Sequence, residues 1–220
     1  PSAIELGCAD PENPCRLPNA MAGDPPLDAV VTRTIEMGVR GKLRGSFSWN
    51  AGVFRADSRN DIMFVADDTS GFGYFRNFGK TRRQGIELAG TGTVGAWTFG
   101  ANYTLLDATY RSEESLLGEG NSANDEGPGF EGVIEIESGN RIPLIPRHMF
   151  KAFTEWQVLP GFSVTADFMA VSGSYARGNE NNAHRPDGVF YLGQGRSGGF
   201  GIVNFGLEYQ PLEALTLFAQ

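Results

Sequence analysis

Two cysteines and two histidines are the side chains best suited to do chemistry in this chain of 220 residues. Cys8 and Cys15 enclose a short run with two prolines and acidic turn formers, which favours a small closed loop over a helix. A disulfide between them is the preferred interpretation, and it implies an oxidising compartment. Half of a metal site is the alternative, but His148 and His184 are isolated, and no second Cys or His pair has a ligand spacing. We therefore expect no metal and no cofactor.

Two glycine-rich segments have the spacing G-x-G-x-x-G, which in dinucleotide-binding proteins opens a helix whose amides hold a pyrophosphate. They are Gly90–Gly95 and Gly193–Gly198. Both lead into strand-like sequence instead, so a hairpin turn and a loop are the expected structures. Ser, His and acidic residues are present but are not grouped, and we expect the chain not to be an enzyme.

The charge of the chain argues against one class of partner. There are 18 Lys and Arg against 26 Asp and Glu, which gives a formal net charge of -8 and a pI near 4.8. Binding to nucleic acid begins with the neutralisation of phosphates, and no basic stripe is visible along the sequence. We therefore expect no nucleic-acid partner.

The elements that must position these residues have a period of two and many aromatic side chains. No apolar run reaches the roughly 18 residues of a membrane helix. The alternation predicts seven full strands and part of an eighth, with no helix: 31–39, 47–64, 86–94, 97–105, 150–156, 162–170, 203–209 and 215–219. Within 47–64 the apolar phase changes from odd to even positions at Phe54, which predicts a β-bulge.

The connections between these strands alternate between short and long. The short ones are 42–44, 95, 160–161 and 211–214, and the longer ones are 67–73, 111–146 and 176–198. In an antiparallel meander this puts all short turns at one rim and all long loops at the other, as in outer-membrane barrels. The predicted fold class is all-β, a segment of an antiparallel transmembrane β-barrel. A soluble β-sandwich, in which strict alternation of loop length would be accidental, is the alternative.

One face of the predicted sheet should contact lipid and the other the barrel lumen. The expected lipid-facing residues are Trp49, Trp97, Phe99, Trp156, Phe162, Phe168, Phe205 and Tyr209. Four of them, Trp97, Trp156, Phe162 and Tyr209, should form an aromatic girdle near the short turns. The expected lumen-facing residues are Glu36, Arg40, Asn50, Glu87, Asn102, Lys151, Glu155, Asp167 and Glu208.

The segment Gly73–Leu88, GYFRNFGKTRRQGIEL, resembles the barrel signature of TonB-dependent outer-membrane receptors, in which an Asn-x-Gly turn precedes a basic cluster and Gly-Ile/Val-Glu. The long strands on either side of it, 49–65 and 97–110, recur in the same order. The Cys8 to Cys15 loop with the residues that follow it also looks like a subgroup of this family. The resemblance covers nearly all of the 220 residues.

This resemblance implies a barrel of about 22 strands with an N-terminal plug, which imports a scarce ligand such as a ferric siderophore with energy delivered through TonB. Residues 1–220 have no plug and are expected to be a partial barrel domain from the C-terminal half. The implied location is the bacterial outer membrane. The implied partners are outer-membrane lipid and lipopolysaccharide, a siderophore-like ligand, and the TonB complex through an N-terminal part outside this sequence. A passive porin-like or small structural barrel and a soluble β-sandwich binding module are the alternatives.

The two longest loops differ in charge. The loop 111–140 carries eight acidic residues against Arg111, so we expect it to be exposed, mobile and not the lip that binds an anionic chelate. The loop 176–198 has more arginines than acids, and arginine pairs with carboxylate or catecholate oxygens while aromatic rings offer flat apolar surface. The ligand-binding candidates are therefore Arg177, Arg185, Arg196, Phe190 and Tyr191. Lipopolysaccharide phosphates are the alternative partner of these arginines.

Overall fold

The structure is a computed structural model that describes residues 27–43, 46–67, 72–128, 132–212 and 214–219 of the chain. Cys8 and Cys15, whose pairing the sequence predicts, lie outside the described residues. Within the described part every regular element is a β-strand. A search of the same residues finds no helix of the length and apolar character needed to cross a membrane.

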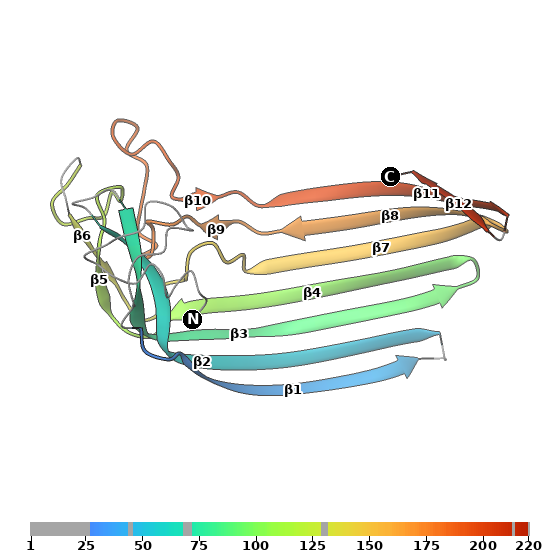
Figure 1. Cartoon of the computed structure of the whole chain (residues 1–220), viewed down its shortest axis with the longest axis horizontal. Helices are drawn as coiled ribbons and strands as arrows, with labels where there is room; N and C mark the ends of the chain where they lie inside the picture. Colours follow the sequence, from blue (N-terminus) through green and yellow to red (C-terminus); the bar gives the residue numbers. More distant parts are fainter. Residues whose placement is uncertain (1–26, 44–45, 68–71, 129–131, 213, 220) are drawn as a thin grey trace.

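Eight strands form one antiparallel sheet in the order β1-β2-β3-β4-β7-β8-β11-β12. They are β1 (Val31–Leu43), β2 (Phe47–Asp67), β3 (Phe72–Val94), β4 (Trp97–Tyr110), β7 (His148–Leu159), β8 (Phe162–Val171), β11 (Phe200–Leu212) and β12 (Leu215–Ala219). Figure 1 shows a curved, open sheet with β1 and β12 at its two edges. The prediction of seven full strands and part of an eighth of a larger barrel is confirmed.

The short turns and the long connections lie at opposite ends of this sheet, as the sequence predicts (Figure 1). At the short-turn end, Gly95 between β3 and β4 has a φ of 60°, a left-handed conformation that glycine adopts without strain. The segment Gly90–Gly95 is thus the end of a strand and a hairpin turn. At the other end, the long connections contain two small sheets, β5 (Glu114–Leu117) with β6 (Val133–Ile136), and β9 (Ser174–Tyr175) with β10 (Arg196–Ser197).

The hairpin of β2 and β3 extends beyond the other strands. β2 has 21 residues and β3 has 23, against 14 in β4, so the connection expected at 67–73 is reduced to 68–71. The turn expected at Asn77 is also wrong, because Asn77 pairs with Ile62 within the sheet. Its side-chain amide donates to the carbonyls of Asn60 at 2.9 Å and Asp28 at 3.1 Å. Pairing with β2 provides hydrogen-bond partners for the backbone of this segment, and the two carbonyls provide partners for the Asn77 amide. These polar groups therefore need no turn to satisfy them.

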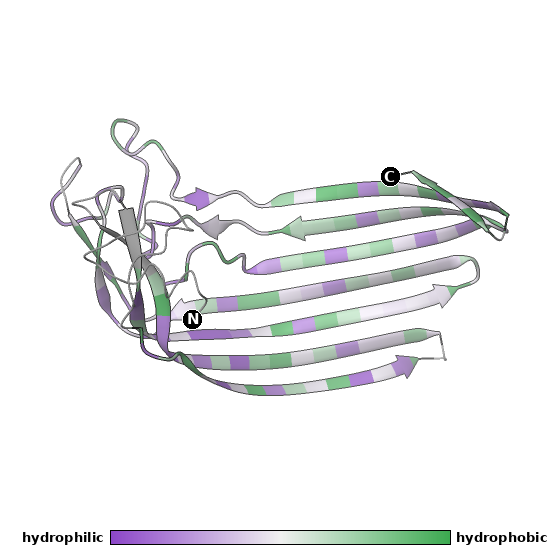
Figure 2. Cartoon of the chain, viewed as in Figure 1, coloured by the Kyte–Doolittle hydropathy of each residue, from purple (hydrophilic) through white to green (hydrophobic). Residues whose placement is uncertain are grey.

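The strand register places the two predicted sets of side chains on opposite faces. Trp97 pairs with Trp156, Trp156 with Val164, and Val164 with Leu207. Paired residues share a face, as do residues two apart along a strand. All of the aromatics expected to face lipid lie on the face of Trp97, which we call the apolar face, and all of the residues expected to face the lumen lie on the other, the polar face. Figure 2 shows the resulting alternation of hydropathy along the strands.

Four successive rungs of paired residues across β1 to β4 carry no charge on the apolar face. They are Leu43–Phe47–Gly92–Phe99, Gly41–Trp49–Gly90–Ala101, Val39–Ala51–Leu88–Tyr103 and Met37–Val53–Ile86–Leu105. Large apolar side chains on this face are uncovered, since Ile35 is 77% and Met37 is 72% exposed. A continuous exposed apolar band is what a barrel presents to hydrocarbon.

Aromatic pairs border the apolar face at its two ends. Near the short turns, the rings of Trp97 and Trp156 stack with centroids 5.1 Å apart and an interplanar angle of 2°. Phe162 and Tyr209 meet edge to face at 6.2 Å. Near the long connections, the Tyr103 hydroxyl lies 2.8 Å from Nδ1 of His148. The predicted girdle residues therefore lie together at the short-turn end, where amphipathic rings suit a membrane interface.

The β-bulge expected at Phe54 is wrong. β2 keeps one register with β3 from Phe47↔Gly92 to Asp67↔Phe72, and no register shift accompanies its pairing with β1. Phe54 instead lies on the polar face, where its ring covers Gly85 on β3. An aromatic side chain that packs over a glycine on the neighbouring strand fills the space that the missing side chain leaves. The change of apolar phase thus reflects this packing within an uninterrupted strand.

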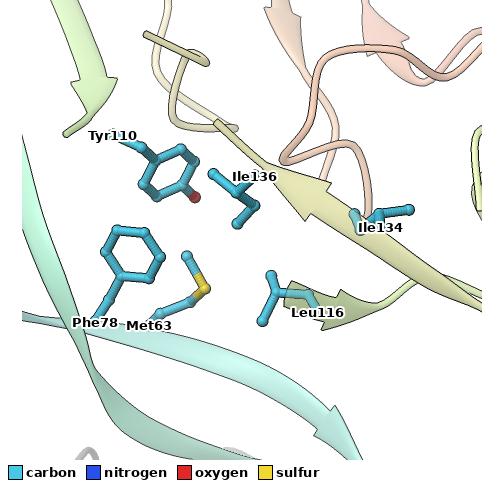
Figure 3. Close-up of a cluster of buried hydrophobic side chains, with 6 residues drawn as sticks. All are labelled: Met63, Phe78, Tyr110, Leu116, Ile134 and Ile136. Atoms are coloured by element: carbon cyan, nitrogen blue, oxygen red, sulfur yellow. The ribbon is translucent and has the colours of Figure 1, made fainter. Parts of the chain in front are cut away.

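A small hydrophobic core lies at the long-loop end. Side chains from the extended hairpin, from β4 and from β5 and β6 meet there with little or no exposure: Met63, Phe78, Tyr110, Leu116, Ile134 and Ile136 (Figure 3). The rings of Phe78 and Tyr110 are 4.9 Å apart. This core fixes the connection between β4 and β7 to the sheet.

Candidate functional site

Most acidic side chains of the loop 111–140 are exposed, as its composition predicts, but several of its other side chains are buried. Leu116, Ile134 and Ile136 are buried in the core at 7%, 0% and 1% exposure, and β5 pairs with β6 across the loop. Glu114, the first residue of β5, forms an ion pair with Arg76 of β3 at 2.9 Å. Apolar residues that alternate with the acids therefore order the loop, which net charge alone does not reveal.

Two asparagine side chains join the connection between β4 and β7, which we call the first connection, to the connection between β8 and β11, which we call the second. The buried Asn121 donates to the carbonyl of Gly178 at 2.7 Å and to the side-chain oxygen of Asn181 at 3.0 Å. In return, the Asn182 side chain accepts from the backbone N–H of Arg141 at 2.6 Å and donates to its carbonyl at 2.9 Å. Because each bond links segments about 40 to 60 residues apart, the two connections form one structural unit.

His184, isolated in the sequence, is a buried part of this unit. Its Nδ1 accepts a hydrogen bond from the backbone N–H of Ser122 at 3.1 Å, and its Nε2 lies 3.0 Å from the carbonyl of Gly193. A backbone donor at Nδ1 and an acceptor at Nε2 fit the neutral ring with its proton on Nε2. The ring also meets that of Tyr191 edge to face at 5.6 Å. His184 therefore links the two connections and holds the second one in shape.

The tip of the second connection is a compact turn around Asp187. Its Oδ1 accepts hydrogen bonds from the backbone N–H groups of Val189 at 2.8 Å, Phe190 at 2.9 Å and Tyr191 at 2.9 Å. These bonds, with that from Val189 first, hold the pKa of Asp187 below its ordinary value. The turn leaves Phe190 67% exposed, while Tyr191 is only 8% exposed.

A cavity of about 150 Å³ lies where the second connection meets the sheet. Its charged and polar lining includes Asp61, Arg83, Arg177 and Glu180. Arg83 forms an ion pair with Asp61 at 3.0 Å and donates to the Thr81 hydroxyl at 3.1 Å, and that hydroxyl donates to Asp61 in turn. Burial raises the pKa of Glu180, against the opposing effects of the Gly178 N–H and Arg177.

The five ligand-binding candidates do not share one surface. Arg177 lines the cavity. Arg196 lies on β10 with its guanidinium 4.6 Å from the ring centre of Tyr175, a cation–π contact. Arg185 is exposed and donates to the carbonyl of His184 at 2.8 Å. Phe190 is exposed, but Tyr191 is buried against the loop and presents no free ring.

Several residues of this region were not singled out from the sequence, among them Asp61, Arg83, Glu180 and Asn121. One signal was available for Arg83. Alternation along β3 places Arg82 on the apolar face and Arg83 on the polar face, so the basic cluster of the family signature must divide between two surfaces. The partners of Asn121 lie 57 and 60 residues away, and no spacing within one segment reveals them.

A second hollow, of about 480 Å³, lies on the polar face toward the short turns. Among the residues that line it are Arg40, Asn50, Asn102 and Phe153. The first three are residues that the sequence predicts to face the lumen. The polar face thus offers cations and amides near the short turns and a charged cavity near the loops, an arrangement suited to binding polar groups. No cluster of His, Cys, Asp and Glu within the described residues has the geometry of a metal site.

Comparison with known proteins gives a consistent result. Residues 4–220 match the family model described as "TonB dependent receptor-like, beta-barrel". The chain is 23% identical over 168 residues to a protein described as the probable TonB-dependent siderophore receptor PiuA of Acinetobacter baumannii, covering 76% of this chain and 20% of that protein.

Solved structures share the fold. The siderophore receptor PiuA from Acinetobacter baumannii matches with a TM-score of 0.57 and 19% identity over 85% of this chain and 23% of that one. The ferric yersiniabactin uptake receptor FyuA from Yersinia pestis matches with a TM-score of 0.59 and 16% identity, over 91% of this chain and 26% of that one. The chain therefore spans about a fifth to a quarter of the length of these proteins.

Proposed function

Because this chain belongs to the TonB-dependent receptor β-barrel family, we propose that it forms part of an outer-membrane receptor that takes up a ferric siderophore with energy supplied through TonB. The rest of the barrel, a plug and the segment that contacts TonB belong in this proposal to the remainder of the receptor. The relatives named as siderophore receptors support the class of ligand. The chain itself contributes a wall of the barrel and two of its loops.

One observation carries this proposal: a two-faced sheet with its packed loops at one end. The apolar face has four uncharged rungs across β1 to β4, which suits lipid, and the polar face carries the charged cavity at the loop end. A soluble β-sandwich does not fit, because every strand of more than four residues in the described part belongs to a single sheet. The loop end is then the extracellular end, where a ligand first meets the receptor.

The candidates in the second connection receive different roles in this proposal. Arg177 lines the cavity, and Arg196, Arg185 and Phe190 are exposed at the loop surface. These four offer guanidinium groups and one apolar ring to an anionic chelate. Tyr191 and His184 hold the loop in shape, since both are buried. The ligand would therefore contact the outer surface of a loop that buried polar bonds keep rigid.

The test uses the full-length receptor that carries this chain. Replacing Arg177, Arg185, Arg196 and Phe190 together with alanine should weaken binding of a ferric catecholate chelate at least about tenfold, measured by fluorescence quenching of the purified receptor. The matched control replaces Val189 and Leu192, exposed apolar residues of the same loop, and should leave affinity unchanged. Uptake of radioactive iron should require TonB in both variants. Uptake without TonB would favour a passive pore instead.

A further inference from the structure

The strand register assembles a basic surface that the sequence does not show as a stripe. Three further rungs of the apolar face follow the four uncharged rungs in the direction of the loop end. They are Ile35–Arg55–Gln84–Asp107, Arg33–Asp57–Arg82–Thr109 and Val31–Arg59–Lys80. The third rung continues to Arg111, whose N–H donates to the carbonyl of Lys80 at 2.8 Å. Basic residues from four separate segments thus gather at the loop end of the lipid-facing side, although the chain has a formal net charge of -8.

These basic residues surround a hollow of about 360 Å³, which we call the basic groove. Its cationic lining consists of Arg33, Arg55, Arg59, Lys80, Arg82 and Arg111, and the one acid of the lining is Asp57. Six positive charges against one negative charge give the groove a formal charge of +5. The hollow also includes Val31 and Ile35, so apolar and basic side chains are in contact with the same space.

Few of these charges are neutralised within the described residues. Asp57 binds Arg55 at 2.7 Å and Arg82 at 2.7 Å. Its single charge is thus already shared between two arginines. For Arg33, Arg59, Lys80 and Arg111, the part of the chain that the structure describes provides no ion pair. Four exposed cations without an acidic partner in the described ranges are therefore available to an external anion.

The position of the groove indicates which anion. It begins directly where the uncharged rungs end, one rung beyond Met37, Val53 and Ile86. A molecule in the groove therefore contacts the apolar band at one end and water at the other. An anionic lipid has this same division, with phosphates at the surface and acyl chains below.

We propose that the basic groove binds the phosphate groups of an anionic glycolipid of the outer leaflet, with the acyl chains along the uncharged rungs. Arg33, Arg59, Lys80 and Arg111 would contact the phosphates, because guanidinium groups match phosphate oxygens in pairs and lysine adds a point charge. The inference rests on the membrane orientation in the proposed function. It is independent of which ligand the receptor imports.

The experiment compares two variants of the full-length receptor in phosphatidylcholine nanodiscs. In the first, Arg33, Arg59 and Lys80 of the groove become glutamine. In the second, Arg40, Lys42 and Lys151, which lie on the polar face, become glutamine, so that both variants lose three positive charges. The probe is a glycolipid with two phosphates, lipid A, and native mass spectrometry measures its binding. A heat-dependent shift in gel mobility verifies that each barrel is folded.

The groove variant should bind lipid A on the order of a hundredfold more weakly than the unchanged receptor, since each basic residue near the surface contributes to phosphate binding. The polar-face variant should bind as the unchanged receptor does. Equal binding by the groove variant would overturn the proposal. If inorganic phosphate displaces the lipid at equal concentration, the site recognises free phosphate and the lipid assignment is wrong. Siderophore uptake is measured in a separate experiment. If the receptor took up no siderophore, the proposed function would be wrong, but the lipid A binding data would still test the basic groove.

Discussion

Gly85 sets the distance between two central strands. A Cβ atom at this position would lie 2.1 Å from the carbonyl oxygen of Leu105 and 2.9 Å from two ring carbons of Phe54. The Phe54 ring can rotate, but the β4 backbone cannot retreat without lengthening the hydrogen bonds of the sheet. We therefore expect Gly85→Ala to lower the free energy of unfolding by about 1–3 kcal/mol, measured by chemical denaturation of the receptor in detergent.

Gly52 provides the matched control for Gly85. It lies on the same polar face in the middle of β2, and a Cβ atom there would meet only the carbonyl oxygen of Met37 at 3.7 Å, an ordinary contact. Gly52→Ala should change the free energy of unfolding by less than about 0.5 kcal/mol. If both substitutions were equally destabilising, the close approach of β4 would not be the cause.

Glu180 should make the docking of the second connection depend on pH. Burial raises its pKa in the folded state above the ordinary value, so its protonated form fits the docked loop better than its charged form. This contribution is fully present below the ordinary pKa of the carboxyl group and is lost as pH rises through the folded pKa. Amide protection factors of residues 176–184, corrected for intrinsic exchange, should therefore increase as pH falls from 7 toward 4.5.

Glu180→Gln separates this effect from other titrating groups. The amide carries no charge at any pH and has nearly the shape of the protonated acid, so the protection of 176–184 at neutral pH should rise and its dependence on pH should disappear. A variant that keeps the pH dependence of the unchanged chain would assign that dependence to another group.

At the scale of elements, the two long connections should lose their docking when one buried bond is removed. Asn121→Ala leaves the Gly178 carbonyl and the Asn181 side chain without their partner, and unmade buried bonds cost about 1–3 kcal/mol. Local opening of the second connection should therefore become at least about tenfold more frequent. Trypsin cleavage after the exposed Arg177, which precedes Gly178, measures this directly.

Asn124→Ala is the matched control in the same connection. Among the described residues, the Asn124 side chain bonds Gly118 at 3.2 Å and Gly127 at 2.6 Å, both within the first connection. Its loss should not change the cleavage rate after Arg177. Faster cleavage in both variants would show that the second connection depends on the general order of the first and not on the bond from Asn121.

The strands could be predicted from the sequence because their signal is local. Alternation of residues such as Trp97, Phe99 and Tyr103 with polar neighbours fixes both the strand and the face that each residue occupies. The loops could not be predicted in this way. His184 bonds to Ser122, 62 residues away, and Ile134 belongs to a core with side chains from β2, β3, β4 and β5. The composition of these loops shows only that they are acidic or glycine-rich. Their ordered structure depends on contacts between residues that are far apart in the sequence.

The sequence did not predict the extension of β2 and β3, for a related reason. The polar run around Asn77 has the composition of a turn, but Ile62 and Asp61 on β2 supply backbone partners across the hairpin. Phe78 and Met63 then enter the core with Tyr110. A turn propensity of one segment was thus outweighed by pairing and burial that involve two others.

At the scale of the whole molecule, the assignment of the apolar face to lipid makes a direct prediction for two adjacent residues of β3. Leu88 lies on the apolar face between Ala51 and Tyr103, and it is 44% exposed. Ala89 lies on the polar face between Asn50 and Asn102. A lysine on the lipid side near the bilayer midplane costs about 2–4 kcal/mol, whereas lumen positions tolerate charge.

Leu88→Lys should therefore lower the free energy of unfolding in phospholipid vesicles by about 2–4 kcal/mol, while Ala89→Lys should leave it nearly unchanged, because its ammonium group reaches the polar hollow that Ala89 helps to line. Denaturant titration followed by tryptophan fluorescence gives both values, and the abundance of each receptor in outer-membrane fractions gives an independent measure. The two substitutions introduce the same side chain at neighbouring positions of one strand, so the added charge is matched. A larger loss for Ala89→Lys would reverse the assignment of the faces and, with it, the position of the basic groove relative to the membrane.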